Sequence, residues 1–312
     1  MRESHRTCVP AHDYSESFKR KEADMPTENQ GFKIEKEPFY MPIKDEVEIF
    51  EQAWAEQIPV LLKGPTGCGK TRFVEYMTWK IGRKFDQASK SGNLDHVPSG
   101  AGSLYTVSCH EDLTARDLTG RFLMKGGEAV WVDGPATMAV RSGAILYLDE
   151  VVEARKDVTV IIHPLTDYRR MLPIETLGIQ ISAPKSFMVV VSYNPGYQSI
   201  RKNLKQSTKQ RFIAVDFAYP PAEKETVIIS KETGIDPKIS EQLVLLGNDI
   251  RNITTIDLEE GVSTRSLIHA AVLMKRGISA KRACSIAIAQ AISDEKEAIA
   301  AIEIIIDKIF RS

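Results

Sequence analysis

The sequence lacks several features that mark common protein classes. No apolar run approaches the ~20 residues needed to cross a bilayer, and residues 1–30 contain no apolar segment of the kind that a secretory signal carries. Charge is balanced, with 41 Lys and Arg against 42 Asp and Glu, so composition gives no electrostatic footprint for nucleic acid or an acidic membrane. These absences predict a cytoplasmic globular protein that acts neither at a membrane nor on nucleic acid.

Cysteine is also scarce. The four cysteines, Cys8, Cys68, Cys109 and Cys284, are far apart and form no CxxC pair. This spacing excludes a disulfide framework or a cysteine zinc site and favours reduced thiols. No Ser/His/Asp or Cys/His arrangement indicates a protease, and His110 is interpreted as an ordinary loop or core histidine, not as a metal ligand.

What the chain does contain is an alternation of short apolar runs and helical stretches. Five runs read as buried strands, at residues 58–63, 104–107, 144–148, 186–192 and 212–217. Helical stretches separate them, for example at 70–83, 134–142 and 155–166. Strands that alternate with helices and are continuously apolar predict an α/β fold with a five-stranded parallel sheet flanked by helices.

The composition and the hydrophobic pattern of the sequence change twice along the chain. Residues 1–35 are polar and poor in aliphatic residues, which predicts a disordered tail. Residues 36–220 hold the α/β pattern, and 221–312 carry helical periodicity without a convincing strand, which predicts a small helical C-terminal domain. Two insertions stand out: a Gly- and Ser-rich segment at 86–103, and an alternating segment at 168–185 that predicts a β-hairpin.

The strongest motif lies directly after the first predicted strand and before a predicted helix. The residues are Gly64, Pro65, Thr66, Gly67, Cys68, Gly69, Lys70 and Thr71, which match GxxxxGK[ST]. Glycines let backbone N–H groups wrap a phosphate chain, and the following helix N-terminus favours its negative charge. We therefore expect this segment to bind ATP, with Lys70 on the β and γ oxygens and the Thr71 hydroxyl on Mg²⁺.

The third predicted strand ends in two carboxylates. Asp149 follows Leu148 directly, where it can hold the Mg²⁺ shell, and Glu150 can orient and activate the attacking water. Acids at strand ends are also common as helix caps, so the pattern alone is weak. Its order after the phosphate-binding loop favours the catalytic interpretation.

Three further polar residues fit the same chemistry. Asn194 follows the fourth strand, where ligand sites in such sheets lie, although Asn-Pro-Gly is also a turn signal. Arg211 precedes the fifth strand and is either a solvated charge or an arginine finger given to a neighbouring subunit. Arg265 opens a C-terminal helix that Ser263 or Thr264 caps, and it can reach the γ-phosphate from the helical domain.

The series GPTGCGKT, LYLDE, SYNPG, QRF and STRS resembles Walker A, Walker B, sensor 1, arginine finger and sensor 2 of AAA+ ATPases. Longer stretches, such as SCHEDLTARDLTGRF and HPLTDYRRMLP, are similar to the CbbQ/NirQ/NorQ group of the MoxR branch. The resemblance runs from about Pro38 to the C-terminus. It implies a homo-hexamer, ATP and Mg²⁺ as cofactors, and an inserted hairpin at 121–133 facing the pore.

The same resemblance implies a von Willebrand factor A-domain partner and a metalloenzyme client. Rubisco, freed from inhibitory sugar phosphates, is the leading client, and nitric oxide reductase or a gas-vesicle protein is the alternative. The tail at 1–35 and the insertion at 86–103 exceed the family pattern, which leaves the client open. Two other classes compete with a remodelling ATPase: a nucleic-acid motor, which the balanced charge disfavours, and a small-molecule kinase, which the helical C-terminal domain disfavours.

Overall fold

The structure is a computed structural model that describes residues 32–90, 100–195, 204–253 and 261–311. Residues 1–31 of the expected tail and 91–99 of the expected 86–103 insertion lie outside the described residues. Two residues of the segment expected as a tail, Phe32–Lys33, form the short strand β1. Helix α2 (Lys70–Lys90) extends into the segment expected as an insertion.

The central sheet has the five predicted strands, all parallel. They are β2 (Val60–Lys63), β3 (Ser103–Ser108), β6 (Ile145–Asp149), β9 (Met188–Tyr193) and β10 (Ile213–Asp216). The order across the sheet is β1-β3-β6-β9-β2-β10, and β1 joins one edge antiparallel to β3. The predicted α/β class and the parallel sheet are therefore confirmed.

Strand register explains where a site can form. Lys63 at the end of β2 pairs with Tyr193 at the end of β9, and Leu148 of β6 pairs with Val191 of β9. The carboxyl ends of these three neighbouring strands therefore meet at one edge of the sheet. Ligands of open α/β sheets bind outside the carboxyl ends of the strands.

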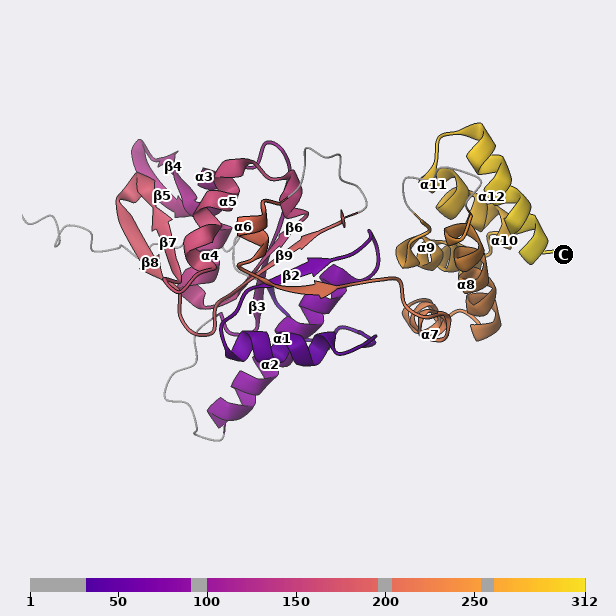
Figure 1. Cartoon of the computed structure of the whole chain (residues 1–312), viewed down its shortest axis with the longest axis horizontal. Coiled ribbons are helices and arrows are strands. Elements are labelled where there is room, and N and C mark those ends of the chain that lie inside the picture. The colour runs from indigo at the N-terminus through magenta and orange to yellow at the C-terminus, as the bar shows by residue number, and fades with distance from the viewer. Residues whose placement is uncertain (1–31, 91–99, 196–203, 254–260, 312) are drawn as a thin grey trace, which may run out of the picture. The chain divides into compact units, whose positions relative to one another are not determined.

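Alternate side chains of the strands pack on opposite faces of the sheet. Leu62 and Tyr147 share a buried cluster with residues of α1 (Glu46–Ala55) and α2, while Leu61 and Leu148 pack with α4 (Pro135–Ser142) and α5 (Lys156–Ile162). Figure 1 shows these two pairs of helices against the two faces. Because both faces are covered, the strands are apolar throughout, as the sequence pattern indicated.

Two hairpins interrupt the α/β order. The first, β4 (Gly120–Lys125) and β5 (Glu128–Asp133), follows the short helix α3 (Ala115–Thr119), and the second is β7 (Met171–Ile174) with β8 (Ile179–Ser182). Both occur where hairpins were expected, at 121–133 and 168–185. In the first hairpin the rings of Phe122 and Trp131 meet edge to face at 5.2 Å, and Met124 is 72% exposed.

The C-terminal region is helical, as predicted. It contains α7 (Ala222–Thr233), α8 (Pro237–Arg251), α9 (Thr264–Lys275), α10 (Ala280–Cys284), α11 (Gln290–Ile292) and α12 (Lys296–Ile309). A π-helical stretch, Ser285–Ala289, joins α10 to α11. These helices bury their own cluster, which includes Leu243, Leu267 and Ile302. Among the helices of the described residues, none has the length and apolar character needed to cross a bilayer.

Candidate nucleotide site

The phosphate-binding loop connects β2 to α2, as the motif predicted. Gly67 has φ of 69°, in the left-handed region, and a Cβ there would lie 2.7 Å from the Cβ of Ser263. Only glycine allows both this conformation and this close approach. The Lys70 ammonium donates to the carbonyl oxygens of Gly64 and Pro65 at 2.8 and 2.9 Å, so its position at the start of α2 is fixed by the loop itself.

A pocket of about 420 Å³ opens at this loop. Its size falls in the ~300–1,000 Å³ range typical of small-molecule and cofactor sites. The predicted site residues that line it are Thr66, Gly67, Cys68, Gly69, Lys70, Thr71, Asp149, Glu150, Asn194 and Arg265. The structure thus gathers residues from the ends of β2, β6 and β9 and from α9, which are far apart in sequence.

The two acids stand at the end of β6 in different settings. Asp149 Oδ1 accepts from the hydroxyl of Tyr147 at 2.7 Å and from the hydroxyl of Ser192. Glu150 adopts a left-handed backbone, with φ of 55° and ψ of 46°, which is uncommon for a residue with a side chain. Such strained residues concentrate at functional sites, where the surrounding structure holds them.

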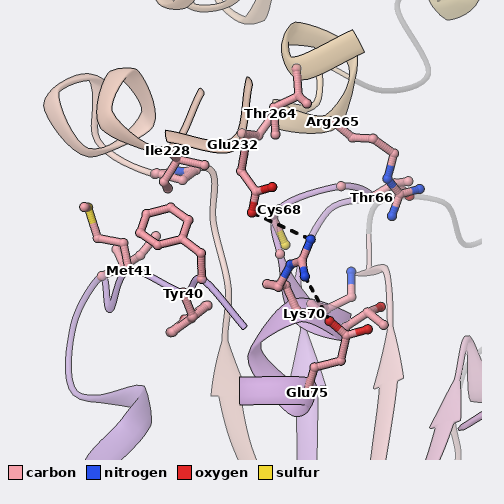
Figure 2. Close-up of a pocket in the computed structure, with 18 of the residues that line it drawn as sticks. Tyr40, Met41, Thr66, Cys68, Lys70, Glu75, Ile228, Glu232, Thr264 and Arg265 are labelled. Atoms are coloured by element: carbon pink, nitrogen blue, oxygen red, sulfur yellow. Dashed lines mark hydrogen bonds and ion pairs between the residues drawn. The ribbon is translucent and has the colours of Figure 1, made fainter. Parts of the chain in front are cut away.

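Asn194 and Arg265 approach the same loop from two elements. The Asn194 amide lies 3.5 Å from the hydroxyl of Thr66, a long contact for a hydrogen bond. Arg265 belongs to the first turn of α9, and Ser263 caps that helix by accepting from the N–H of Ser266 at 3.1 Å. In Figure 2 the Arg265 side chain extends toward the phosphate-binding loop.

Thr264, the other candidate cap, has a different role. Its hydroxyl donates to Glu225 at 2.6 Å, and that buried carboxylate also pairs with both terminal nitrogens of Arg251 at 2.8 Å. The guanidinium of Arg251 stacks 4.1 Å from the ring of Tyr219. The start of α9, and with it Arg265, is therefore held by a buried polar network.

Arg211 does not line the pocket of its own chain. Its Nη1 donates to Asp167 Oδ2 at 3.1 Å, and Arg169 binds the same carboxylate through Nη2 at 2.7 Å. His163 lies nearby, with Nε2 at 3.1 Å from the hydroxyl of Thr208. Burial, followed by the charge of Arg211, lowers the pKa of His163 from its ordinary value.

The apolar half of the pocket was missed from the sequence. Phe39, Tyr40, Met41 and Ile43 line it from the segment before α1, and three further apolar residues, Pro220, Ile228 and Ile268, line it from the C-terminal side. An aromatic and apolar run, PFYMPI, inside an otherwise polar stretch was the signal that could have found the first group.

Glu46 holds this apolar segment in shape. Its carboxylate accepts from the hydroxyl of Tyr40 and from the backbone N–H groups of Ile43 and Lys44, each at 2.7 Å. Burial raises the pKa of Glu46, but these three donors outweigh it and the pKa lies below its ordinary value. The Tyr40 ring also packs 5.3 Å from that of Phe73 in α2.

Charged side chains complete the rim. Arg72, the residue after Thr71, contacts Glu75 of its own helix at 3.4 Å and Glu232 of α7 at 3.6 Å (Figure 2). One end of the pocket has a glycine-rich backbone and a lysine, with carboxylates beside them, and the other end is apolar. These two ends match the charged phosphate chain and the apolar base of a nucleoside triphosphate. The fold and the site together define an ATPase with an AAA domain.

Comparison with known proteins agrees with this class. Residues 59–212 match the AAA domain of the dynein-related subfamily, and residues 225–309 match the CbbQ/NirQ/NorQ C-terminal family. The chain belongs to the CbbQ/NirQ/NorQ family of AAA+ ATPases, which confirms the resemblance inferred from its motifs.

Three relatives show how far the similarity extends. NorQ of Paracoccus denitrificans is 53% identical over 83% of this chain and 89% of its own. NirQ of Pseudomonas aeruginosa, a denitrification regulatory protein, is 49% identical over 86% of this chain and 96% of its own. CbbQ of Hydrogenophilus thermoluteolus is 48% identical over 85% and 92%.

Proposed function

We propose that this protein hydrolyses Mg-ATP in the described pocket and uses the cycle to remodel a client protein. The observation that carries the proposal is the convergence of the phosphate-binding loop, Asp149, Glu150, Asn194 and Arg265 on one pocket. In it the apolar residues around Tyr40 and Ile228 would hold the base, and residues 64–71 the phosphate chain.

The donor set fits a magnesium ion. Mg²⁺ prefers oxygen ligands, and the hydroxyl of Thr71 and the carboxylate of Asp149 line the pocket together. When bound, the ion would neutralise charge on the phosphates. Glu150 would accept the proton of the attacking water, Asn194 would help to position that water, and Arg265 would contact the terminal phosphate.

A neighbouring subunit would complete the site. Arg211 lies outside the pocket of its own chain, and its pairing with Asp167 gives it a defined position from which to enter another pocket. This arrangement supports a ring, a hexamer by family resemblance, in which each arginine is given in trans. An arginine supplied this way raises hydrolysis roughly 10³–10⁵-fold in well-studied systems.

The ATPase test uses two substitutions in the pocket. Lys70→Ala removes the phosphate-binding ammonium, so nucleotide binding measured by calorimetry should be lost. Glu150→Gln removes the base but keeps the fold, so it should bind Mg-ATP normally while kcat falls about 10²–10³-fold. Glu175→Gln, an exposed acid away from the pocket, is the matched control. Normal turnover in Glu150→Gln would remove Glu150 from this role.

The client proposed here is nitric oxide reductase, acting with a von Willebrand factor A-domain partner. The similarity to NorQ, at 53%, and to NirQ, a denitrification regulatory protein, supports this client over Rubisco, since CbbQ is 48% identical. The test incubates immature reductase or inhibited Rubisco with the protein, its partner and Mg-ATP. Activation of the reductase is expected, and activation of Rubisco alone would overturn the choice.

A further inference from the structure

Ser192 is the first residue of the SYNPG motif, in which only Asn194 was assigned a role, and it contacts both acids. It belongs to β9 and is fully buried. Its hydroxyl donates to Asp149 Oδ1, and its oxygen accepts from the backbone N–H of Glu150 at 3.2 Å. A hydroxyl carries a single proton, a carboxylate can only accept and an N–H can only donate. The directions of both bonds are therefore fixed, and one side chain restrains both acids.

Tyr147 contributes a second donor to the same oxygen. Its hydroxyl donates to Asp149 Oδ1 at 2.7 Å, and the ring is fully buried. A carboxylate can only accept a hydrogen bond, so the phenol O–H is the donor in this contact. Two donors on Oδ1 restrain the carboxylate, and Oδ2 would be the oxygen that binds magnesium.

The bond to Glu150 has a different consequence. The backbone of Glu150 is left-handed, a conformation that a glutamate rarely adopts. Its N–H is anchored on the Ser192 hydroxyl, so the turn that directs the Glu150 side chain depends on β9, not on β6 alone. Tyr147 has no corresponding contact with the Glu150 backbone among the described hydrogen bonds.

We propose that Ser192 is the positioning residue that orients Asp149 toward magnesium and Glu150 toward the attacking water. The proposal rests on the proposed ATPase function and assigns different roles in it to Ser192 and Tyr147. Ser192 acts on metal binding and on the chemical step, whereas Tyr147 acts on metal binding alone. Groups that orient metal-binding residues typically change metal affinity or activity about 10–100-fold when removed.

The test compares four variants of the full chain: Ser192→Ala, Ser192→Thr, Tyr147→Phe and Ser186→Ala. Ser186 is the matched control, because it is buried just before the same strand and its hydroxyl has no hydrogen-bond partner among the described residues. Calorimetry measures ATP affinity with Mg²⁺ and with EDTA, and the ratio of the two gives the contribution of the metal. Steady-state assays at saturating Mg²⁺ give kcat, and circular dichroism confirms folding.

Ser192→Ala should reduce the magnesium-dependent gain in ATP affinity about 10-fold and lower kcat about 10–100-fold, while ATP affinity in EDTA stays unchanged. Tyr147→Phe should reduce the same gain but keep kcat within about 3-fold of the wild type. Ser192→Thr, which retains the hydroxyl on a strand, should restore both quantities, and Ser186→Ala should match the wild type.

Three outcomes would overturn the proposal. The first is that Ser192→Ala has the kcat of the wild type and the same ratio of ATP affinities with Mg²⁺ and with EDTA. The second is that Ser192→Thr fails to restore the quantities that Ser192→Ala loses. The third is a loss of kcat in Tyr147→Phe as large as that in Ser192→Ala, which would show that the two residues do not have different roles. Absence of Mg-ATP binding by the wild type would instead refute the proposed function, so the two failures are distinct.

Discussion

Asp167 shows how a single carboxylate can fix two arginines. Arg169 binds it through Nε at 3.1 Å and Nη2 at 2.7 Å, and Arg211 binds it at 3.1 Å from the far end of the α/β region of the sequence. Hydrogen bonds from Arg169 first, then its charge and the bond from Arg211, hold the pKa of Asp167 at about 2, although burial acts in the opposite direction. The carboxylate therefore stays charged at any physiological pH.

This depressed pKa predicts a specific loss of stability in acid. An unfolded aspartate titrates near pH ~4, so the stabilisation is fully present above that pH and is lost as pH falls toward about 2. Thermal melting should show Asp167→Asn less stable than the wild type at pH 7, with the difference shrinking between pH 4 and pH 2.

The control for this prediction is Asp307→Asn. Asp307 pairs with Lys281, but its side chain is 64% exposed, so its removal should change stability little at any pH. A difference between Asp167→Asn and the wild type that stays constant from pH 7 to pH 2 would contradict the assignment.

Individual residues also show what a sequence can and cannot predict about a site. That Lys70 and Asp149 would line one pocket was predictable, because a glycine-rich loop and a strand-end acid follow strands whose carboxyl ends meet at one edge of the sheet. Ser192 and Tyr147 were not, because their roles depend on the pairing of Tyr147 with Val190 across β6 and β9, which brings their hydroxyls to one oxygen. Both residues lie within the LYLDE and SYNPG motifs, but the register that joins them is set by the packed sheet and cannot be read from either motif alone.

At the scale of elements, a half-buried cation, Arg170, ties the start of the β7–β8 hairpin to the sheet region. The guanidinium of Arg170 donates to three backbone carbonyls, those of Gln57 at 3.0 Å, Pro184 at 3.1 Å and Phe187 at 2.8 Å. Burial lowers the pKa of Arg170 from its ordinary value. The arginine thereby joins the loop before β2 to both ends of the segment that precedes β9.

Removal of this cation should destabilise the fold. Arg170→Met leaves three carbonyls without their donor, and each charged hydrogen bond contributes about 1.5–3 kcal/mol, so a net loss of about 2–4 kcal/mol in the free energy of unfolding is expected. Urea denaturation measures it. Lys185→Met, an exposed neighbour, should stay within about 0.5 kcal/mol of the wild type. Equal losses in the two variants would show that Arg170 does not anchor the hairpin.

The elements themselves were largely predictable, and their boundaries less so. Apolar runs marked every parallel strand because both faces of the sheet are covered. Alternation around Leu172 and Ile181, with Gly178 at the turn, marked the β7–β8 hairpin. The two-residue β1 could not be found, since Phe32 is 75% exposed and its only sequence context is polar. The π-helical stretch after Cys284 likewise has no signal in the helical periodicity.

At the scale of the whole molecule, the position of Arg211 predicts that hydrolysis needs more than one subunit. A pocket assembled from Glu150 of one chain and Arg211 of the next is complete only at a head-to-tail interface. Arg211→Ala and Glu150→Gln should each be inactive alone. Their mixture in equal amounts should recover about one quarter of wild-type activity, because random assembly gives that share of interfaces both intact groups.

The measurement is the steady-state ATPase rate of the reassembled mixture. Its control is the mixture of Glu150→Gln with Lys70→Ala, in which no subunit has an intact pocket of its own and no activity should return. Absence of recovery in the first mixture, with both variants assembled, would show that Arg211 acts within its own chain.

The aromatic pair of the β4–β5 hairpin has a practical consequence. The indole N–H of Trp131 donates to Asp133 at 2.7 Å, and its ring meets Phe122 edge to face. The chain has three tryptophans. Of the other two, Trp54 packs against Phe85, and Trp79 lies beneath the guanidinium of Arg83. With those two replaced by phenylalanine, the fluorescence of Trp131 would be an intrinsic optical reporter of hairpin movement during turnover, without an attached dye.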